Sequence, residues 1–263
     1  MEHPTVHFAS VDILGVAIHN LTLDETLRAM TEMALSGQPH HVMTVNPEFV
    51  MIAQRDPDFR SVLERATICV ADGMGIIWGS RILGRPLKER ITGSDTIPAF
   101  AHRAAQYGIR IFLLGAAPGV AEETAAILTA RNPGLVIAGT FAGSPRAEEE
   151  DEICRLIERS RAHVLLVAYG PPKQDLWIAR TQSRLRIPLA IGVGGTFDFI
   201  AGKVRRAPVW MQKLGLEWLF RLLREPRRWR RMLTLPEFAA AIVREKIFPQ
   251  PNEIRWSVKR QNQ

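Results

Sequence analysis

Residues 66–95 bring together the groups most suited to chemistry. A mostly apolar run at residues 67–71 ends in Asp72-Gly73, and small and apolar residues at helical spacing follow from Met74. This order predicts a buried strand, a tight turn and a helix. Because an open α/β sheet presents its ligand site at the carboxyl ends of its strands, Asp72 is expected there. It could act as a general base in a cleft, or simply cap the following helix.

A second polar turn follows at residues 90–95, with the sequence Arg-Ile-Thr-Gly-Ser-Asp. The Arg90 guanidinium and the amides of a starting helix are together suited to a diphosphate. The neighbouring basic residues allow a plainer interpretation, in which Arg90 belongs to a solvated surface.

Three more turns carry polar residues at predicted strand ends. Thr44 and Asn46 close a strand at residues 41–45 and could line the same edge as Asp72, or only make the turn. Two prolines fix the turn at residues 169–175, which starts with Tyr169 and contains Gln174.

The turn at residues 192–198 is glycine-rich. Gly194 and Gly195 allow a backbone to approach a ligand closely, and Asp198 can bond a ribose or a base. Ordinary α/β turn chemistry could explain each turn alone, but it explains four at successive strand ends less well.

Apolar strands alternate with amphipathic helices along residues 1–202, after a short hairpin within residues 6–19. This predicts an α/β fold with a mostly parallel sheet and helices on both faces. The predicted strands lie at residues 41–45, 67–71, 110–114, 135–138, 163–168 and 188–193. The predicted helices lie at residues 24–35, 48–54, 58–65, from 74, and at 96–107, 120–130, 148–159 and 172–184.

Composition and charge narrow the class of protein. A chain of 263 residues that is 46% hydrophobic and 23% charged can form a sizeable core. Two cysteines make a disulfide framework improbable and fit a reducing compartment. We find no leader pattern and no apolar run long enough to span a bilayer, so we expect a cytoplasmic protein.

The net charge of +7 is uneven, since residues 203–263 carry fifteen Lys and Arg against five Asp and Glu. We therefore predict a core at 1–202 and a helical, basic appendage at 203–263 that meets an anionic partner.

Arginines in the appendage fall at helical spacing, at Arg221, Arg224, Arg228 and Arg231. On one continuous helix they would share a face, although Pro226 could kink it. Tryptophans and leucines accompany them, a pattern typical of peripheral contact with an anionic membrane. Single-stranded nucleic acid is the alternative partner.

Several other motifs are absent or weak. The glycine turn at residues 114–119 lacks the dinucleotide spacing, which disfavours a nicotinamide-dependent oxidoreductase. Asp56-Pro57-Asp58 could hold a metal, but Asp58 also fits as a helix cap, so we take the motif as structural. No zinc spacing, P-loop or G-x-S-x-G occurs, and we expect neither metal nor cofactor.

Six motifs in order resemble the WecG/TagA/CpsF glycosyltransferases (glycosyltransferase family 26). They are Thr44-Val-Asn-Pro-Glu, Ala71-Asp-Gly-Met-Gly, Arg90-Ile-Thr-Gly-Ser-Asp, Tyr169-Gly-Pro-Pro-Lys-Gln-Asp, Gly192-Val-Gly-Gly-Thr-Phe-Asp and Glu217-Trp-Leu-x-Arg-Leu.

The resemblance implies a Rossmann-like core with a membrane-targeting appendage, and a tendency to form homo-oligomers. It implies an inverting transferase that moves N-acetylmannosamine, its uronic acid or glucose from a UDP-sugar. The acceptor would be a polyprenyl-diphosphate-linked sugar at the cytoplasmic membrane face, in teichoic acid, common antigen or exopolysaccharide synthesis. Nucleic acid would not be a partner.

The resemblance also implies residue roles. Asp72 would be the base, and Arg90 would hold the UDP diphosphate. Thr44, Asn46 and Gln174 would position the sugars, Tyr169 would line the substrate site, and Gly194, Gly195 and Asp198 would hold the nucleotide. Arg221, Arg228 and Arg231 would reach the lipid diphosphate or close over the site. From the residues alone, a non-catalytic nucleotide-binding protein with a basic docking tail stays open.

Overall fold

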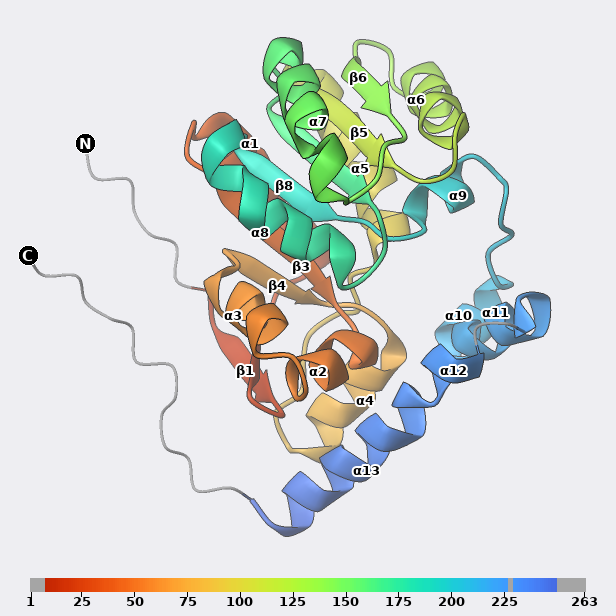
Figure 1. Ribbon diagram of the computed structural model, residues 1–263. Coiled ribbons are helices and arrows are strands. Elements are labelled where there is room, and N and C mark those ends of the chain that lie inside the picture. Colours follow the sequence, from red (N-terminus) through yellow and green to blue (C-terminus); the bar gives the residue numbers. More distant parts are fainter. Residues whose placement is uncertain (1–7, 227–228, 250–263) are drawn as a thin grey trace, which may run out of the picture.

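The computed structural model describes residues 8–226 and 229–249, and a six-stranded parallel sheet forms its centre (Figure 1). The order across the sheet is β4-β3-β8-β7-β5-β6, and every neighbouring pair is parallel. The strands are β3 (His40–Val45), β4 (Ile68–Ala71), β5 (Arg110–Gly115), β6 (Val136–Phe141), β7 (Val164–Ala168) and β8 (Leu189–Gly192). The predicted α/β class is confirmed. An antiparallel hairpin, β1 (Ser10–Ile13) and β2 (Val16–His19), precedes the sheet, as expected.

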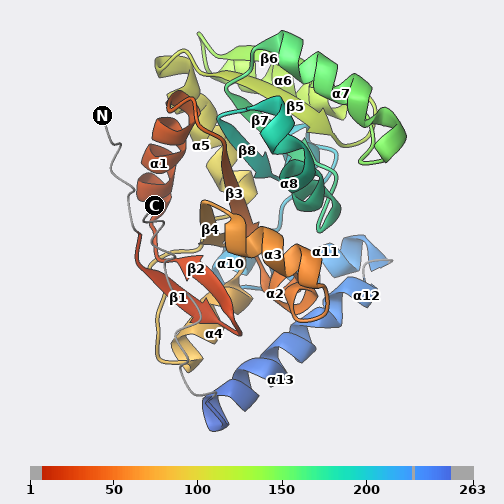
Figure 2. The ribbon, with the colours of Figure 1, turned by 60° about the vertical axis from the view of Figure 1, so that its left-hand side comes forward.

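Helices cover both faces of the sheet, because successive strand residues point to opposite sides. In β3, Val42 belongs to the buried cluster that includes residues of α1, α5, α6 and α9, whereas Met43 belongs to the cluster that includes residues of α2, α3 and α4. Figure 2 shows this layering from the side. The helices are α1 (Leu23–Leu35), α2 (Pro47–Ala53), α3 (Pro57–Arg65), α4 (Met74–Ile82), α5 (Gly93–Gln106), α6 (Val120–Arg131), α7 (Ala147–Ser160), α8 (Lys173–Leu185) and α9 (Thr196–Ile200).

Caps set where the helices begin. The helix predicted from residue 24 begins at Leu23 and is capped by Thr22, whose hydroxyl accepts from the amide of Glu25 in a capping box. Asp56, not Asp58, caps α3, which leaves Asp58 in the first turn. The helix predicted from residue 96 begins at Gly93.

After an irregular stretch at residues 203–208, the described part of the basic C-terminal segment forms helices joined by short turns: α10 (Val209–Lys213), α11 (Glu217–Arg224), α12 (Trp229–Met232) and α13 (Thr234–Ile247). The condition for a single arginine face, one continuous helix, is not met by the described residues, whereas the break expected at Pro226 is close to the end of α11. The helix stops at Glu225, whose backbone leaves the helical region, and Pro226 follows. Arg221 and Arg224 therefore lie on α11 and Arg231 on α12, and Arg228 lies outside the described residues.

Helix α13 packs against α2 and α4 (Figure 1). Phe238 and Ile242 are buried, and a Cβ added at Gly79 of α4 would lie 3.2 Å from both side chains. The C-terminal helices are thus built onto the core over the carboxyl ends of β3 and β4. No helix in the described ranges is long and apolar enough to cross a membrane.

Candidate active site

A cleft of about 1020 Å³ lies between the carboxyl ends of the strands and the C-terminal helices. Pockets for one small ligand usually measure about 300–1,000 Å³, so this one has room at the upper end of that range. Every predicted site residue that the structure describes lines it: Thr44, Asn46, Asp72, Arg90, Tyr169, Gln174, Gly194, Gly195, Asp198, Arg221 and Arg231. The turns after the strands bring the residues of the core together, and α11 and α12 add Arg221 and Arg231.

Asp72 lies directly after β4, and its backbone amide donates to the Val45 carbonyl at 2.7 Å. Its side chain does not cap α4, because Gly73 is the N-cap residue and its φ of 85° fits glycine. Burial raises the pKa of Asp72 to about 7. Arg90 opposes that rise, Glu217 adds to it, Arg221 opposes it and Asp95 adds to it more weakly. A carboxyl group poised near neutral pH is suited to general-base work.

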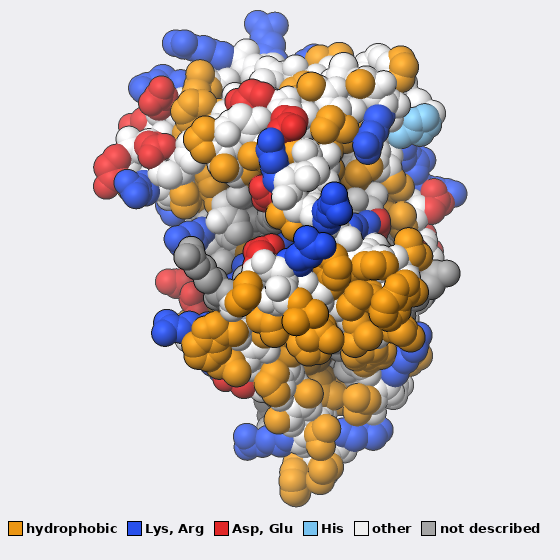
Figure 3. All heavy atoms as spheres, turned by 90° about the vertical axis from the view of Figure 1, so that its right-hand side faces the viewer, with side chains coloured by type: hydrophobic (Ala, Val, Ile, Leu, Met, Phe, Trp, Pro, Cys, Tyr) orange, Lys and Arg blue, Asp and Glu red, His pale blue; other side chains and the backbone are white. Residues whose placement is uncertain are grey.

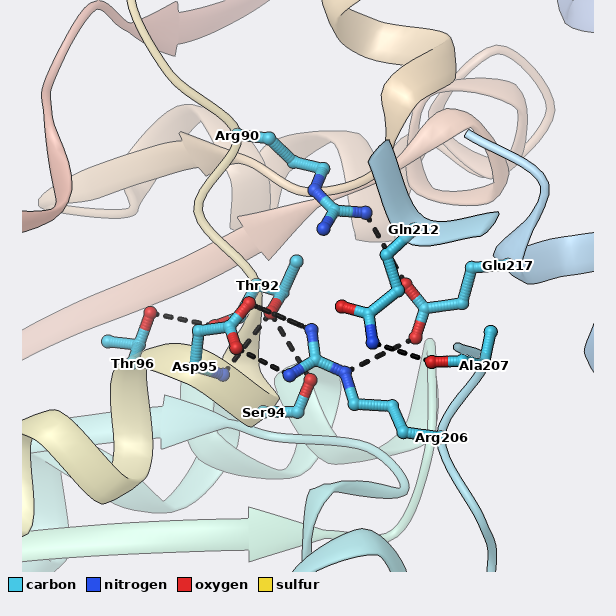
Figure 4. Close-up of polar contacts among 9 residues, drawn as sticks. All are labelled: Arg90, Thr92, Ser94, Asp95, Thr96, Arg206, Ala207, Gln212 and Glu217. Carbon is cyan, nitrogen blue, oxygen red and sulfur yellow. Dashed lines mark hydrogen bonds and ion pairs between the residues drawn. The ribbon is translucent and has the colours of Figure 1, made fainter. Parts of the chain in front are cut away.

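An ionic network holds the C-terminal helices to the strand edge beside Asp72 (Figure 4). Glu217 of α11 accepts from Arg90 at 3.3 Å and from Arg206 at 3.4 Å. Arg206 also donates to the Asp95 carboxylate, with Nη2 2.8 Å from Oδ2. This partner lowers the pKa of Asp95. The network therefore alternates in sign, and Glu217 lies between the two guanidinium groups.

The N terminus of α5 borders the cleft, since Thr92, Gly93 and Ser94 all line it. The Thr92 hydroxyl accepts from the amide of Asp95 and donates to its carboxylate. A Cβ at Gly93 would lie 2.8 Å from Thr196 Oγ1, so the two turns approach too closely for a larger residue. The start of α5 thus adds an anion-favouring helix end beside Arg90.

Gln174 ties two turns of the cleft together. Its side chain is only 2% exposed, and Oε1 accepts from the amides of Gly170 at 3.1 Å and Gly194 at 2.9 Å. A Cβ at Gly192 would lie 2.4 Å from Gln174 Nε2, so this glycine makes the contact possible. The structure thereby gives Gln174 a bracing role, and its contact with a sugar stays a prediction.

Tyr169 packs edge-on against Trp177, with ring centroids 6.0 Å apart. Burial raises the pKa of the Tyr169 phenol, so the hydroxyl stays protonated at neutral pH. Asn46 caps α2, because Oδ1 accepts from the amide of Phe49. Its amide NH2 group remains a donor at the cleft wall, beside the largely buried Thr44.

Arg221 crosses from α11 to the turn after β8. Its guanidinium lies 4.8 Å from the ring centroid of Phe199, and Nη2 is 3.4 Å from a Cβ placed on Gly195. Asp198 of α9 lines the cleft beside this turn, with Oδ2 3.8 Å from a Cβ placed on Gly195. The predicted nucleotide turn and the predicted arginine thus meet.

Arg231 forms a two-pronged ion pair with Glu48 in the first turn of α2, with Nε 2.9 Å from Oε1. Both residues line the cleft. Reasoning from the sequence assigned no role to Glu48, Arg206 or Glu217. Glu48 and Glu217 belong to quoted motifs, whereas nothing in the sequence distinguishes Arg206 from the other basic residues near it.

The site combines the Asp72 carboxyl group, whose pKa is about 7, with the guanidinium groups of Arg90 and Arg221 at the end of a parallel sheet. This is the arrangement of an α/β enzyme that can remove a proton while stabilising an anion. No group of three or more His, Cys, Asp or Glu side chains placed to hold a metal occurs within residues 8–226 and 229–249.

The sequence profile of the glycosyl transferase WecG/TagA/CpsF family matches residues 11–252. The chain therefore belongs to this family, and the resemblance noted from its motifs is confirmed.

Named relatives include N-acetylglucosaminyldiphosphoundecaprenol N-acetyl-beta-D-mannosaminyltransferases from three bacteria. The Bacillus spizizenii protein is 35% identical over 205 residues, which cover 78% of this chain and 79% of that protein. The Bacillus subtilis protein is 33% identical over 81% of this chain and 84% of its own. A Staphylococcus aureus protein is 30% identical over 240 residues, which cover 90% of this chain and 94% of that protein.

The raised pKa of Asp72 predicts how its removal changes stability with pH. The pKa of Asp72 is higher in the folded state than in the unfolded state. Ionisation of Asp72 therefore lowers the free energy of unfolding of the wild-type protein as the pH rises from about 4 to about 7. Asp72→Asn lacks this titration and should melt a few degrees higher than wild type at pH 8, with a smaller difference at pH 5. Thermal melts at both pH values measure this. An equal difference at both pH values would contradict the raised pKa.

Removing the charge of Glu217 should lower the pKa of Asp72 below about 7, because a like charge disappears and Arg90 loses a competing partner. Carbon-13 NMR of the Asp72 carboxyl in Glu217→Gln follows the titration directly. Glu237→Gln, which removes a carboxylate paired with Arg55 at the surface, is the matched control. A curve unchanged by Glu217→Gln would show that the network does not act on Asp72.

Proposed function

We propose that this protein is an inverting, metal-independent glycosyltransferase that moves a sugar from a UDP-sugar to a polyprenyl-diphosphate-linked sugar. The observation that carries the proposal is Asp72, with a pKa of about 7, in a cleft shared with Arg90 and Arg221. The names of the relatives support an N-acetylmannosamine-type sugar and an N-acetylglucosamine-diphosphate-lipid acceptor. Glucose is the alternative sugar, and the product would enter teichoic acid or exopolysaccharide synthesis.

In this proposal Asp72 accepts the proton of the acceptor hydroxyl as its oxygen attacks the anomeric carbon of the donor. The bond from that carbon to the diphosphate breaks, and its electron pair leaves with UDP. Attack opposite the leaving group inverts the anomeric centre. Arg90 stabilises the charge that develops on the diphosphate, an effect that is strongest where water is excluded.

The remaining residues would orient the two substrates. Gly194, Gly195 and Asp198 would hold the nucleotide, because the backbone after β8 is open to the cleft there. Arg221 reaches the same turn and would contact the donor phosphates. Thr44, Asn46 and Gln174 would position the sugars, with Tyr169 at the wall. Arg231 would meet the acceptor diphosphate, with Arg228 as a further candidate.

Metal independence is supported by the cations already present. Arg90 and Arg221 offer guanidinium groups at the donor end of the cleft, and the α5 N terminus adds its dipole. These groups can neutralise a leaving diphosphate in the way a divalent ion would.

Transfer from a panel of UDP-sugars to a prenyl-diphosphate-N-acetylglucosamine, with and without chelator, tests the proposal. We expect one N-acetylmannosamine-type donor to react, the rate to survive chelation, and Asp72→Asn to lower it by roughly 10²–10⁴-fold, as loss of a general base does. Asp58→Asn, at an exposed first-turn position of α3, is the control. Absence of transfer from every donor would refute the proposal.

We also propose that residues 203–263 place the enzyme on the inner face of the cell membrane. Hydrophobic side chains gather over the lower half of the face in Figure 3, with Lys and Arg beside them. An exposed apolar patch of this kind usually marks an interaction surface. The exposed hydrophobic residues of the C-terminal segment include Val209, Trp210, Leu214, Leu223, Trp229 and Leu233.

The double variant Trp210→Asp/Trp229→Asp should bind anionic phospholipid vesicles roughly tenfold more weakly, because two interfacial anchors are lost and acidic charge is added. Vesicle sedimentation measures it. Leu35→Asp/Val136→Asp, which changes exposed apolar residues of α1 and β6, is the matched control. Equal loss in both variants, or none in the first, would contradict membrane docking through this face.

A further inference from the structure

The cleft continues from its charged end into an apolar groove between α4 and α13. Helix α4 contributes Met74, Trp78 and Ile82, which are four residues apart and therefore lie on one face. At 1.5 Å per residue this stripe is about 12 Å long. Trp78 is 42% exposed and Ile82 47% exposed, although both line the cleft.

Helix α13 provides the opposite wall. Its Phe238 and Ile242 side chains are buried against α4. A second stripe of apolar residues on α13 does not belong to the buried core cluster. That stripe consists of Leu235, Ala239 and Val243, also four residues apart, and all three line the cleft. The two apolar stripes thus face one space.

Both stripes begin at the charged end of the cleft. Met74 comes two residues after Asp72, and Leu235 comes four residues after Arg231, whose guanidinium pairs with Glu48. A ligand that fits a charged site followed by an apolar groove has an anionic group joined directly to a hydrocarbon chain. A nucleotide sugar lacks the hydrocarbon, and a free phosphate does not need it.

We propose that the groove between α4 and α13 binds the part of the acceptor's prenyl chain nearest its diphosphate. The inference rests on the proposed function and names the part of the substrate that this groove recognises. The chain lies along Trp78, Ile82, Ala239 and Val243 while Arg231 contacts the diphosphate, which places the linked sugar toward Asp72. The groove belongs to the cleft, whereas Val209, Trp210 and Leu223 are exposed on the C-terminal helices and do not line it.

Ala239→Asp tests the groove, because residue 239 is exposed on α13 and a carboxylate there should fold normally but repel hydrocarbon. Two acceptors are compared in detergent micelles without a bilayer: diphosphate-N-acetylglucosamine on a long prenyl chain and on a two-carbon chain. Relative to wild type, we expect Ala239→Asp to raise the KM for the long-chain acceptor at least roughly tenfold and the KM for the short-chain acceptor less than about twofold. Val243→Asp should behave in the same way, and Leu35→Asp should change neither KM value. Equal effects of Ala239→Asp on both acceptors would overturn the inference.

A binding measurement separates failure of the inference from failure of the proposed function. Calorimetry should show wild type binding geranylgeranyl diphosphate at least roughly tenfold more tightly than inorganic diphosphate, and Ala239→Asp should remove most of that difference. Chain-dependent binding without any transfer would refute the proposed reaction while retaining the groove. If Ala239→Asp instead loses vesicle binding and keeps its preference for the long chain, the groove holds bilayer lipid and the inference is wrong.

Discussion

The ion network centred on Glu217 is the constraint on which the arrangement of the cleft depends. Arg90 and Arg206 would repel each other across a partly buried site if no anion lay between them. Glu217 supplies that anion from α11, and Asp95 holds the far side of Arg206. A half-buried charge left without its partner is costly, so the network favours the arrangement in which α11 lies over the strand ends. That arrangement also carries Arg221 to the turn after β8.

Small residues make the approach of these segments possible. Gly215, in the turn before α11, has a φ of +71°, and a Cβ there would lie 2.6 Å from the Trp78 ring. At the carboxyl end of the central strand β8, Gly192 makes room for the Gln174 side chain in the same way. Charge therefore favours bringing the C-terminal helices onto the sheet, and glycine removes the steric obstacle.

The sheet and most of the cleft could be predicted because their signals are local. Apolar runs flanked by turns marked the strands, and parallel strands place their carboxyl ends at one edge, so Thr44, Asp72 and Gln174 had to lie near one another. The partners across the cleft could not be predicted in this way. Arg206 and Asp95 are 111 residues apart, and Arg231 and Glu48 are 183 apart. Periodicity does not reveal which of many arginines meets which carboxylate. For the arginines at i, i+3 and i+7 spacing, the sequence left open one continuous helix or a kink at Pro226, and in the structure α11 ends at Arg224, just before that proline.

The electrostatics of Asp72 follow from two opposing demands on one cleft. Guanidinium groups able to stabilise an anion also favour the ionised carboxylate and so make it a weaker base. Burial acts in the other direction, and here it prevails, since the pKa of Asp72 is about 7 despite Arg90 and Arg221. Glu217 also raises the pKa of Asp72. It pairs with Arg90 and so offsets part of the cationic charge, and it places a like charge near the Asp72 carboxylate. A drier cleft strengthens the hold of the arginines on an anion and raises the basicity of the carboxylate together. Closing the C-terminal helices over the strand ends can therefore improve both properties, whereas adding another cation would improve one at the expense of the other.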